Sequence, residues 1–208
     1  LIEGETPATM AKSTGIGLIE LPSVFERLEP DIVITVGDRF ETMSTTLAAA
    51  YMNIPIAHTM GGEVSGTIDE SIRHAVTKFA HIHLPASREA AERIIKLGER
   101  SEMVFRVGCP RIDLVAEILK DDFSEIDDEF LSRGVGSEIN LERPFVIVSQ
   151  HPVTTEYGKS FDQIVQTVDA IKELKLQAIV LLPNNDAGHK QIIDHITSSD
   201  LKWFPSLP

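Results

Sequence analysis

The stretch DIVITVGDRFE, residues 31–41, decides the fold class of this chain. Most of its first six residues are β-branched or apolar, which is typical of a strand in a buried parallel sheet. Gly37 then allows a sharp turn, and a helical period begins at Phe40. A strand that ends in a glycine turn and leads directly into a helix is the first part of a β–α–β unit. It therefore predicts an α/β fold with a parallel sheet.

The same alternation of short apolar runs and longer helical periods continues along the chain. Strands are expected at Asp31–Val36, Ile54–His58, Ile82–Leu84, Met103–Val107, Phe145–Ser149 and Gln177–Leu182, with a further strand starting at Lys202. Helices are expected at Thr9–Leu28 (interrupted by glycines), Phe40–Tyr51, Ile68–Phe79, Arg88–Leu97, Arg111–Leu119, Ser160–Leu174 and Ala187–Ser198. This order predicts doubly wound parallel sheets with helices on both faces.

A domain boundary is expected between Leu119 and Arg143, where the sequence turns acidic and loses its long apolar runs. We predict a first Rossmann-like domain over residues 1–119 and the beginning of a second over residues 143–208. Residues 120–142 are the predicted linker, with a bridging helix around Ser124–Arg133. The chain opens without an initiator methionine and stops just after a predicted strand, so we expect an interior piece of a longer polypeptide.

The composition disfavours several classes of function. The formal net charge is −13, and such a surface repels nucleic acids and anionic membranes. No apolar run approaches the roughly 20 residues that a membrane-spanning helix needs. Cys109 is the single cysteine, so the chain can form no internal disulfide, and a reducing, cytoplasmic location is expected. A small anionic ligand is still compatible with these numbers, because a pocket can gather a few Arg, His and backbone donors.

The residues that follow each strand are the first place to look for a site, since open parallel sheets bind ligands outside the carboxyl ends of their strands. Asp38 and Arg39 stand directly after the first quoted strand. Asp38 either caps the helix that begins near Phe40 or faces a ligand, and the sequence leaves both readings open.

The segment MGGEVSGTIDESIRH, residues 60–74, follows the next strand. Its glycines indicate a loop whose backbone approaches another group closely. Glu63 lies within this loop, where a carboxylate is unusual unless it faces a ligand, and Thr67 with Glu70 fits a capping box. Two pairs have the spacing of helix-surface ion pairs, Asp69–Arg73 and Glu70–His74. Together these residues would gather several carboxylates, an Arg and a His at one sheet edge, which favours a functional site.

The second half of the chain repeats the pattern. His151 follows the strand Phe145–Ser149, and Thr154 or Thr155 could cap a helix or bind phosphate. Asn184 follows the next strand in a turn. His151 is read either as a structural histidine or as a residue facing the crevice between the domains.

Other chemistries are not supported. Gly15 and Gly17 have no strand before them and no third glycine in place, so a dinucleotide fingerprint is absent, as is a Walker A sequence. His81 and His83 share one face of a strand but lack an evident third metal ligand. Cys109 has no obvious base partner and is read as a packing residue.

Four motifs together resemble the hydrolysing UDP-N-acetylglucosamine 2-epimerases of sialic-acid pathways. They are the segments 37–41, 61–74, 108–110 and 151–155, with Pro183-Asn184 in addition. The resemblance implies a glycosyltransferase-B-like fold, in which two Rossmann-like domains face a cleft that holds a nucleotide-sugar. It also implies release of UDP and N-acetylmannosamine without a cofactor or a metal, and a homo-oligomer, either a dimer or a tetramer. The initial strand and glycine loop and the later serine-rich nucleotide loop of that family are missing, so the isolated piece is expected to be inactive.

Site residues follow from the same resemblance. It implies that Asp38, Glu63, Asp69, Arg73 and His151 line the sugar and phosphate site, with Glu70 beside them. Arg39, Asn184 and Thr154 are expected to contact the nucleotide. Loss of UDP must be coupled to removal of a weakly acidic C2 proton, so a carboxylate base is needed together with cationic stabilisation of the diphosphate. We expect a carboxylate among Asp38, Glu63 and Asp69 to transfer the protons, with His151 and Arg73 on the phosphates. Two alternatives stay open: the same reaction on UDP-N,N'-diacetylbacillosamine, and a nucleotide-sugar-binding module without turnover.

Overall fold

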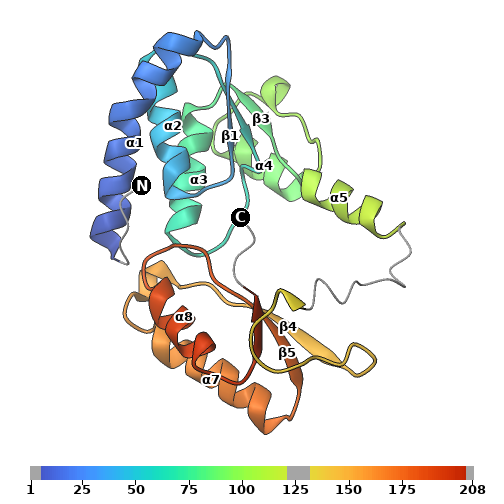
Figure 1. The fold of residues 1–208 in the computed structure, drawn as a ribbon. Coiled ribbons are helices and arrows are strands. Elements are labelled where there is room, and N and C mark those ends of the chain that lie inside the picture. The colour runs from blue at the N-terminus through green and yellow to red at the C-terminus, as the bar shows by residue number, and fades with distance from the viewer. Residues whose placement is uncertain (1–5, 121–131, 205–208) are drawn as a thin grey trace. The chain divides into compact units, whose positions relative to one another are not determined.

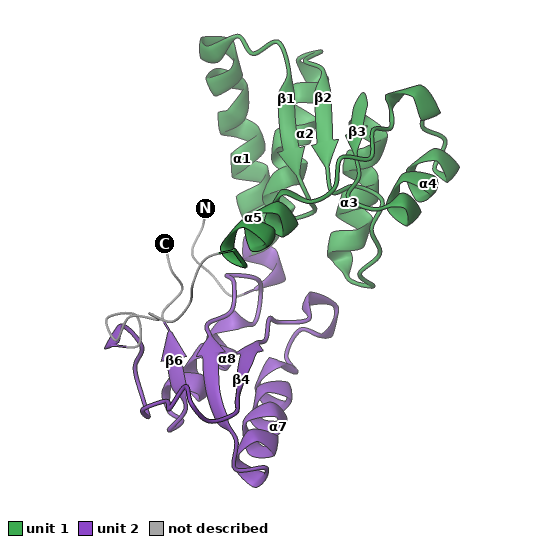
Figure 2. Ribbon diagram, turned by 90° about the vertical axis from the view of Figure 1, so that its right-hand side faces the viewer, with its two compact units in different colours: residues 1–2, 10–121 green, residues 3–9, 122–208 purple. Residues whose placement is uncertain are grey.

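A computed structural model describes residues 6–120 and 132–204 of the chain. These residues form two compact units, one made of residues 10–120 and the other of residues 6–9 and 132–204 (Figure 2). Each unit is an α/β structure built on its own three-stranded parallel sheet, as the alternation of strands and helices predicts. The predicted bridging helix falls mostly on residues 121–131, outside the described residues.

The sheet of the first unit has the strand order β1-β2-β3, with β1 at Val33–Val36, β2 at Ile56–Thr59 and β3 at Ile82–Leu84. All pairings are parallel, and Thr35, His58 and His83 lie in register across the three strands. Parallel pairing brings the carboxyl ends of these strands to one edge, where the loops at residues 37–39 and 60–67 begin.

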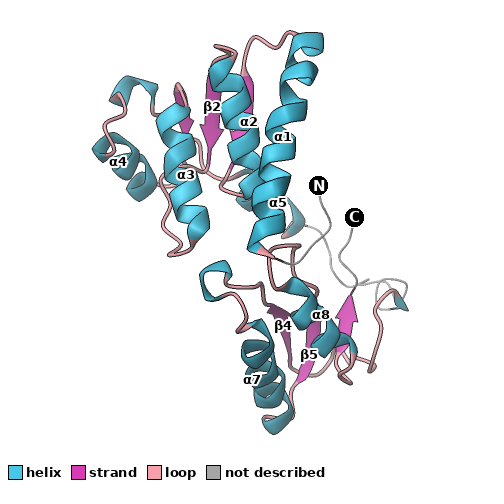
Figure 3. Cartoon of the chain, turned by 90° about the vertical axis from the view of Figure 1, so that its left-hand side faces the viewer, coloured by secondary structure: helices cyan, strands magenta, loops and turns pink. Residues whose placement is uncertain are grey.

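The helices of this unit are α1 (Pro7–Leu28), α2 (Phe40–Tyr51), α3 (Ile68–Phe79), α4 (Arg88–Lys96) and α5 (Pro110–Ile118). Figure 3 shows α1, α2 and α3 in a row on one face of the sheet. Their packing buries Phe25, Val33, Ala48, Ala49, Ile56 and Ala80 in one apolar core. Because burial of apolar area drives folding, this core fixes α2 and α3 against the strands that carry the site.

Helix α1 runs through Gly15 and Gly17 without a break, so the expected interruption was wrong (Figure 1). Gly17 serves a helix contact instead, since a Cβ there would lie 2.9 Å from Oγ of Ser44 on α2. The same Ser44 hydroxyl donates a hydrogen bond of 2.7 Å to the carbonyl of Thr14. Close packing of two helices thus explains a glycine that helix propensity alone disfavours.

The strand predicted at Met103–Val107 is not formed. A short 3-10 helix, Ser101–Met103, occupies its start, and only Val104 makes a bridge, with His83. The N–H of Phe105 still donates to the carbonyl of His83 at 2.8 Å, so the segment follows β3 without becoming a full strand. Phe105 and Val107 remain about half exposed, so too little apolar area is buried here to hold a longer ladder.

The sheet of the second unit has the order β4-β5-β6, with β4 at Phe145–Ser149, β5 at Gln177–Leu181 and β6 at Lys202–Phe204. The strand expected to begin at Lys202 is therefore confirmed. Helices α7 (Ser160–Glu173) and α8 (His189–Thr197) pack against this sheet, and a 3-10 turn, Thr154–Glu156, follows β4. The core of this unit consists of Ile164, Val168, Ile171, Ala178, Val180, Ile192 and Ile196. Within the described ranges no helix is long and apolar enough to span a bilayer.

Candidate functional site at the strand ends of the first unit

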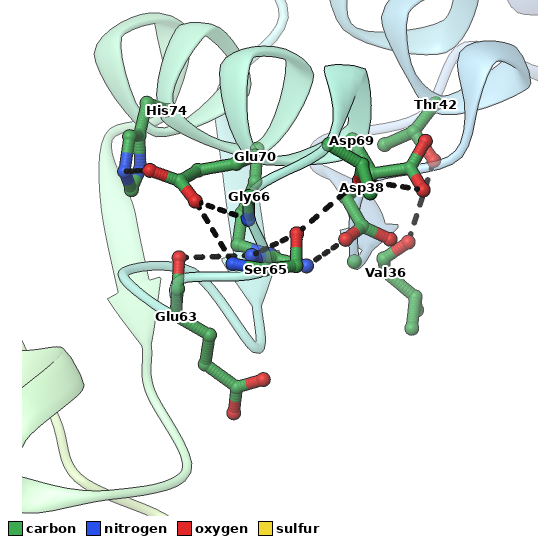
Figure 4. A network of polar contacts seen from close by, with 12 residues as sticks. Val36, Asp38, Thr42, Glu63, Ser65, Gly66, Asp69, Glu70 and His74 are labelled. Carbon is green, nitrogen blue, oxygen red and sulfur yellow. Dashed lines mark hydrogen bonds and ion pairs between the residues drawn. The ribbon is translucent and has the colours of Figure 1, made fainter. Parts of the chain in front are cut away.

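An ion pair joins the carboxyl end of β1 to helix α3. Gly37 has a φ of +70°, which turns the chain so that Asp38 meets the Arg73 guanidinium (Figure 4). The Arg73 side chain is 8% exposed and that of Asp38 22%. Asp38 does not cap α2, because the N-cap position is Arg39 and no side-chain cap bond is present there. The reading of Asp38 as a helix cap was therefore wrong: its carboxylate pairs with Arg73 of the same unit, and its contact with a ligand stays a prediction.

Arg73 also fixes the loop at residues 60–67. Its Nη1 donates to the carbonyl oxygen of Glu63 at 2.8 Å and lies 3.5 Å from Oγ of Ser65. Burial lowers the pKa of the Arg73 guanidinium, although the group remains a cation at any physiological pH. One buried cation therefore connects Asp38 to the backbone that carries Glu63.

Glu70 shapes the same loop rather than closing a capping box. Its carboxylate accepts the backbone N–H of Ser65 at 2.9 Å and of Gly66 at 2.7 Å. Hydrogen bonds from Gly66 and then Ser65 hold the pKa of Glu70 below its usual range. The Thr67 side chain makes no cap bond, so the predicted capping box was wrong. The reason is that two adjacent loop N–H groups offer the carboxylate better donors. The predicted Glu70–His74 pair is present at 3.8 Å.

Glu63 and Asp69 differ in how their carboxylates are used. Among the described residues the Glu63 carboxylate makes no hydrogen bond or ion pair, and Figure 4 shows it pointing away from the polar network. Asp69 accepts a hydrogen bond from the Thr67 hydroxyl at 3.3 Å and takes part in a further interaction. The backbone of Glu63 is therefore fixed by Arg73, while its carboxylate is available to a ligand.

His58 is a buried residue of this region that the sequence analysis did not single out. Its Nε2 lies 2.8 Å from the carbonyl of Gly37, which can only accept, so Nε2 carries the proton. Its Nδ1 lies 3.2 Å from the Thr77 hydroxyl on α3. A Cβ on Gly61 would approach this ring to 2.9 Å, so the glycine loop rests on the imidazole. A histidine at a strand end, followed by two glycines, is the signal that could have marked it.

We expect the neutral state of His58 to make stability depend on pH. Burial lowers the pKa of His58 from 6.5 to about 4, so between these values the unfolded chain binds a proton that the folded protein does not. The stabilisation is complete above pH 6.5 and is lost as the pH falls towards 4. At about 1.4 kcal/mol per pKa unit it amounts to about 3 kcal/mol. The free energy of unfolding by urea, measured from pH 7 to 4.5, should fall more steeply for the natural protein than for His58→Gln. An equal loss of stability with falling pH in both proteins would contradict the neutral state assigned to His58.

Arg39 follows Asp38 in the chain, and its side chain contacts its own neighbours Phe40 and Glu41. Its Nε pairs with Glu41 at 3.3 Å, and the guanidinium stands 5.5 Å from the centre of the Phe40 ring. The side chain is about one third exposed. Its predicted contact with the nucleotide stays a prediction.

The second unit brings together two of its predicted residues at the carboxyl ends of β4 and β5. The N–H of Asn184 donates to Nδ1 of His151 at 3.0 Å, while Nε2 lies 3.4 Å from the Ser149 hydroxyl. The Asn184 side chain donates to Asp186 at 2.7 Å. The Thr154 hydroxyl is buried and has no hydrogen-bond partner among the described residues. Because Nδ1 accepts the Asn184 N–H, Nε2 is the ring nitrogen of this exposed histidine that can donate a hydrogen bond.

His81, His83 and Cys109 have contacts that are typical of structural residues. His83 is buried with Nε2 3.3 Å from Glu99, and Nδ1 of His81 accepts the N–H of Ile56 at 3.2 Å. Within residues 6–120 and 132–204 no three His, Cys, Asp or Glu side chains come close enough to hold a metal ion. Cys109 stands at the N-cap of α5.

Two α/β units with parallel sheets, each with polar side chains after its strands, fit the class of glycosyltransferase-B-like proteins, and solved structures of similar fold place the chain in that class. A crystal structure of UDP-GlcNAc 2-epimerase from Methanocaldococcus jannaschii, in complex with UDP-GlcNAc and UDP, shares this fold with a TM-score of 0.74 at 18% identity, over 95% of this chain and 56% of that chain. The sequence profile described as UDP-N-acetylglucosamine 2-epimerase matches residues 1–208. The chain belongs to this family.

Two curated relatives support the assignment. The UDP-N,N'-diacetylbacillosamine 2-epimerase (hydrolyzing) of Legionella pneumophila is 36% identical over 181 residues, which cover 87% of this chain and 46% of that protein. The UDP-N-acetylglucosamine 2-epimerase of Neisseria meningitidis is 29% identical over 207 residues, covering 100% of this chain and 52% of that protein. The chain thus spans about half the length of these relatives.

Proposed function

We propose that the protein containing this chain is a hydrolysing 2-epimerase that converts UDP-N-acetylglucosamine into N-acetylmannosamine and UDP, for the synthesis of sialic-acid-type sugars. Family membership supports 2-epimerisation of a nucleotide-sugar. The observation that carries the proposal lies at one sheet edge, where a fixed Asp38–Arg73 ion pair stands beside the Glu63 carboxylate, which has no partner among the residues that the structure describes. A base held next to fixed charges is what a proton abstraction from a weak carbon acid requires.

In the proposed reaction Glu63 takes the C2 proton of the sugar. The electron pair of the C2–H bond forms a C1=C2 double bond, and the C1–O bond breaks so that its electron pair leaves with UDP. Water then adds to C1 of the glycal, and C2 receives a proton on the opposite face. General-base assistance of this kind contributes about 10²–10⁴ to a rate.

The Asp38–Arg73 ion pair has a different role from that of Glu63. The contacts of Arg73 with Asp38 and with the Glu63 carbonyl support a role in organising the site, in place of free contact with the diphosphate. We assign contact with the diphosphate to His151, with Asn184 at the nucleotide.

A second substrate is favoured by one specific observation. The relative with 36% identity is named for UDP-N,N'-diacetylbacillosamine, while that with 29% identity is named for UDP-N-acetylglucosamine. Both sugars would use the same C2 chemistry, and the shape of the sugar pocket would choose between them. A module that binds nucleotide-sugars without turnover is the third possibility, and it would release no UDP.

The test uses the full-length protein with each of the two nucleotide-sugars, and the products are identified by proton and phosphorus NMR. UDP and free N-acetylmannosamine are expected from the first sugar. If UDP is released only from the bacillosamine derivative, that nucleotide-sugar is the substrate and UDP-N-acetylglucosamine is not. A UDP-linked 2-epimer would show a non-hydrolysing enzyme, and intact sugar in both samples would contradict catalysis.

A further inference from the structure

The glycine loop before Glu63 rests on helix α4, and an arginine of that helix holds it. Nη1 of Arg93 donates to the carbonyl oxygen of Gly62. Gly62 has a φ of +79°, and a Cβ there would come within 2.3 Å of the Ala90 carbonyl oxygen, one turn earlier on the same helix. The loop backbone therefore lies directly against α4, where a side chain at residue 62 would not fit.

The backbone on both sides of Glu63 is bound by charged side chains. The consecutive carbonyls of Gly62 and Glu63 accept from Arg93 and Arg73, respectively. Two residues further on, the Glu70 carboxylate accepts the N–H groups of Ser65 and Gly66. Hydrogen bonds that involve a charged group are about twice as strong as neutral ones. Three charges from α3 and α4 thus determine the path of the five-residue loop that carries Glu63.

We propose that Arg93 is a positioning residue that holds the loop at residues 62–66 in the one conformation that presents Glu63 to the sugar. This inference rests on the proposed function, in which Glu63 carries the C2 proton. Arg93 donates to the backbone of Gly62, and its charge also helps to lower the pKa of Glu70, which binds the other end of the loop. Its effect on the reaction therefore passes through the loop backbone that directs the Glu63 side chain. Loss of the bond frees the Gly62 peptide to rotate, and the Glu63 carboxylate then moves with it.

The experiment compares four variants of the full-length protein, one of which is Arg93→Ala for rescue by added guanidinium. Arg93→Met keeps the length of the side chain but removes its donors, and Arg93→Lys keeps the charge with one compact donor group. Arg88→Met is the matched control, since Arg88 lies on the same helix, is 74% exposed and, within the described part of the chain, pairs with the surface residues Glu89 and Glu92 alone. Deuterium exchange of the peptide that covers residues 60–66 is measured alongside kcat and KM for UDP release.

For Arg93→Met we expect faster deuterium exchange, confined to residues 60–66. We expect kcat to fall about 100-fold, because a small displacement of a reacting group has an effect of this size, while KM stays within about threefold of the natural value. Arg93→Lys should recover about a tenth of the lost rate. Added guanidinium should restore part of the activity of Arg93→Ala. Arg88→Met should match the natural protein in every measurement.

Unchanged loop exchange in a folded Arg93→Met variant would overturn the proposal, and so would a kcat within threefold of the natural value. A rise in KM alone would do the same, since it would indicate a role in binding. If the natural protein turns over neither nucleotide-sugar, the proposed function fails, and the exchange of residues 60–66 still decides whether Arg93 holds the loop. Should Arg93→Met not fold, the same two readouts are taken from Arg93→Lys.

Discussion

Glu63→Gln is expected to lower kcat for UDP release by about 10³-fold, within the range that a general base contributes. The amide has nearly the same shape as the carboxylate but cannot accept the C2 proton. Because the Glu63 side chain has no partner among the described residues, the free energy of unfolding should change by less than about 0.5 kcal/mol. Steady-state kinetics and urea unfolding of the full-length variant measure the two quantities.

Glu92→Gln is the matched control for this change. Glu92 lies on α4, is 59% exposed and pairs weakly with Arg88 at 3.9 Å. Its replacement should leave both kcat and stability at their natural values. A Glu63→Gln variant with more than a tenth of the natural kcat would remove Glu63 from the role of base and leave Asp69 as the next candidate.

Asp38→Asn is expected to damage both stability and activity. Removal of one partner leaves the Arg73 cation, which is 8% exposed, without its counter-charge. Breaking a fully buried pair costs about 3–5 kcal/mol, and we expect about 2 kcal/mol here because Asp38 is partly exposed. Activity should fall by about 10²–10³-fold, since a preorganised charge at the site is lost.

A double variant separates the two effects. Asp38→Asn with Arg73→Gln removes both charges, so no unpaired charge remains and more than half of the lost stability should return. The activity should stay low, because the organised charges are still absent. Equal stability of the single and double variants in urea unfolding would show that the loss does not come from an unpaired Arg73 charge. Recovered activity would show that the charges serve only folding.

The contrast between Glu63 and Asp38 illustrates what the sequence could predict. Strand positions and the rule that ligands bind at strand ends were enough to select Asp38, Glu63, Arg73 and His151 as candidates. The pairing of Asp38 with Arg73 was not predictable, because the two residues are 35 positions apart and meet only when β1 and α3 pack together. Residue types at strand ends follow local rules, whereas partners follow from tertiary packing.

His58 and Arg93 escaped the sequence analysis for a related reason. Their main partners are the backbone carbonyls of Gly37 and Gly62, and every residue has such a group. Only the fold brings these carbonyls to the side chains. The strand expected at Met103–Val107 failed in the opposite way, since a local pattern of apolar residues was present but the packing that would bury it was not.

The most direct test of the proposed reaction is to incubate the full-length protein with UDP-N-acetylglucosamine in deuterated water and to follow the sugar by proton NMR. Elimination across C1 and C2 requires that C2 receive its new proton during the reaction. The natural protein is expected to produce UDP and N-acetylmannosamine that carries deuterium at C2. The Glu63→Gln variant is expected to form both products far more slowly. N-acetylmannosamine that retains the original C2 proton would contradict the elimination route and the role of Glu63 in it.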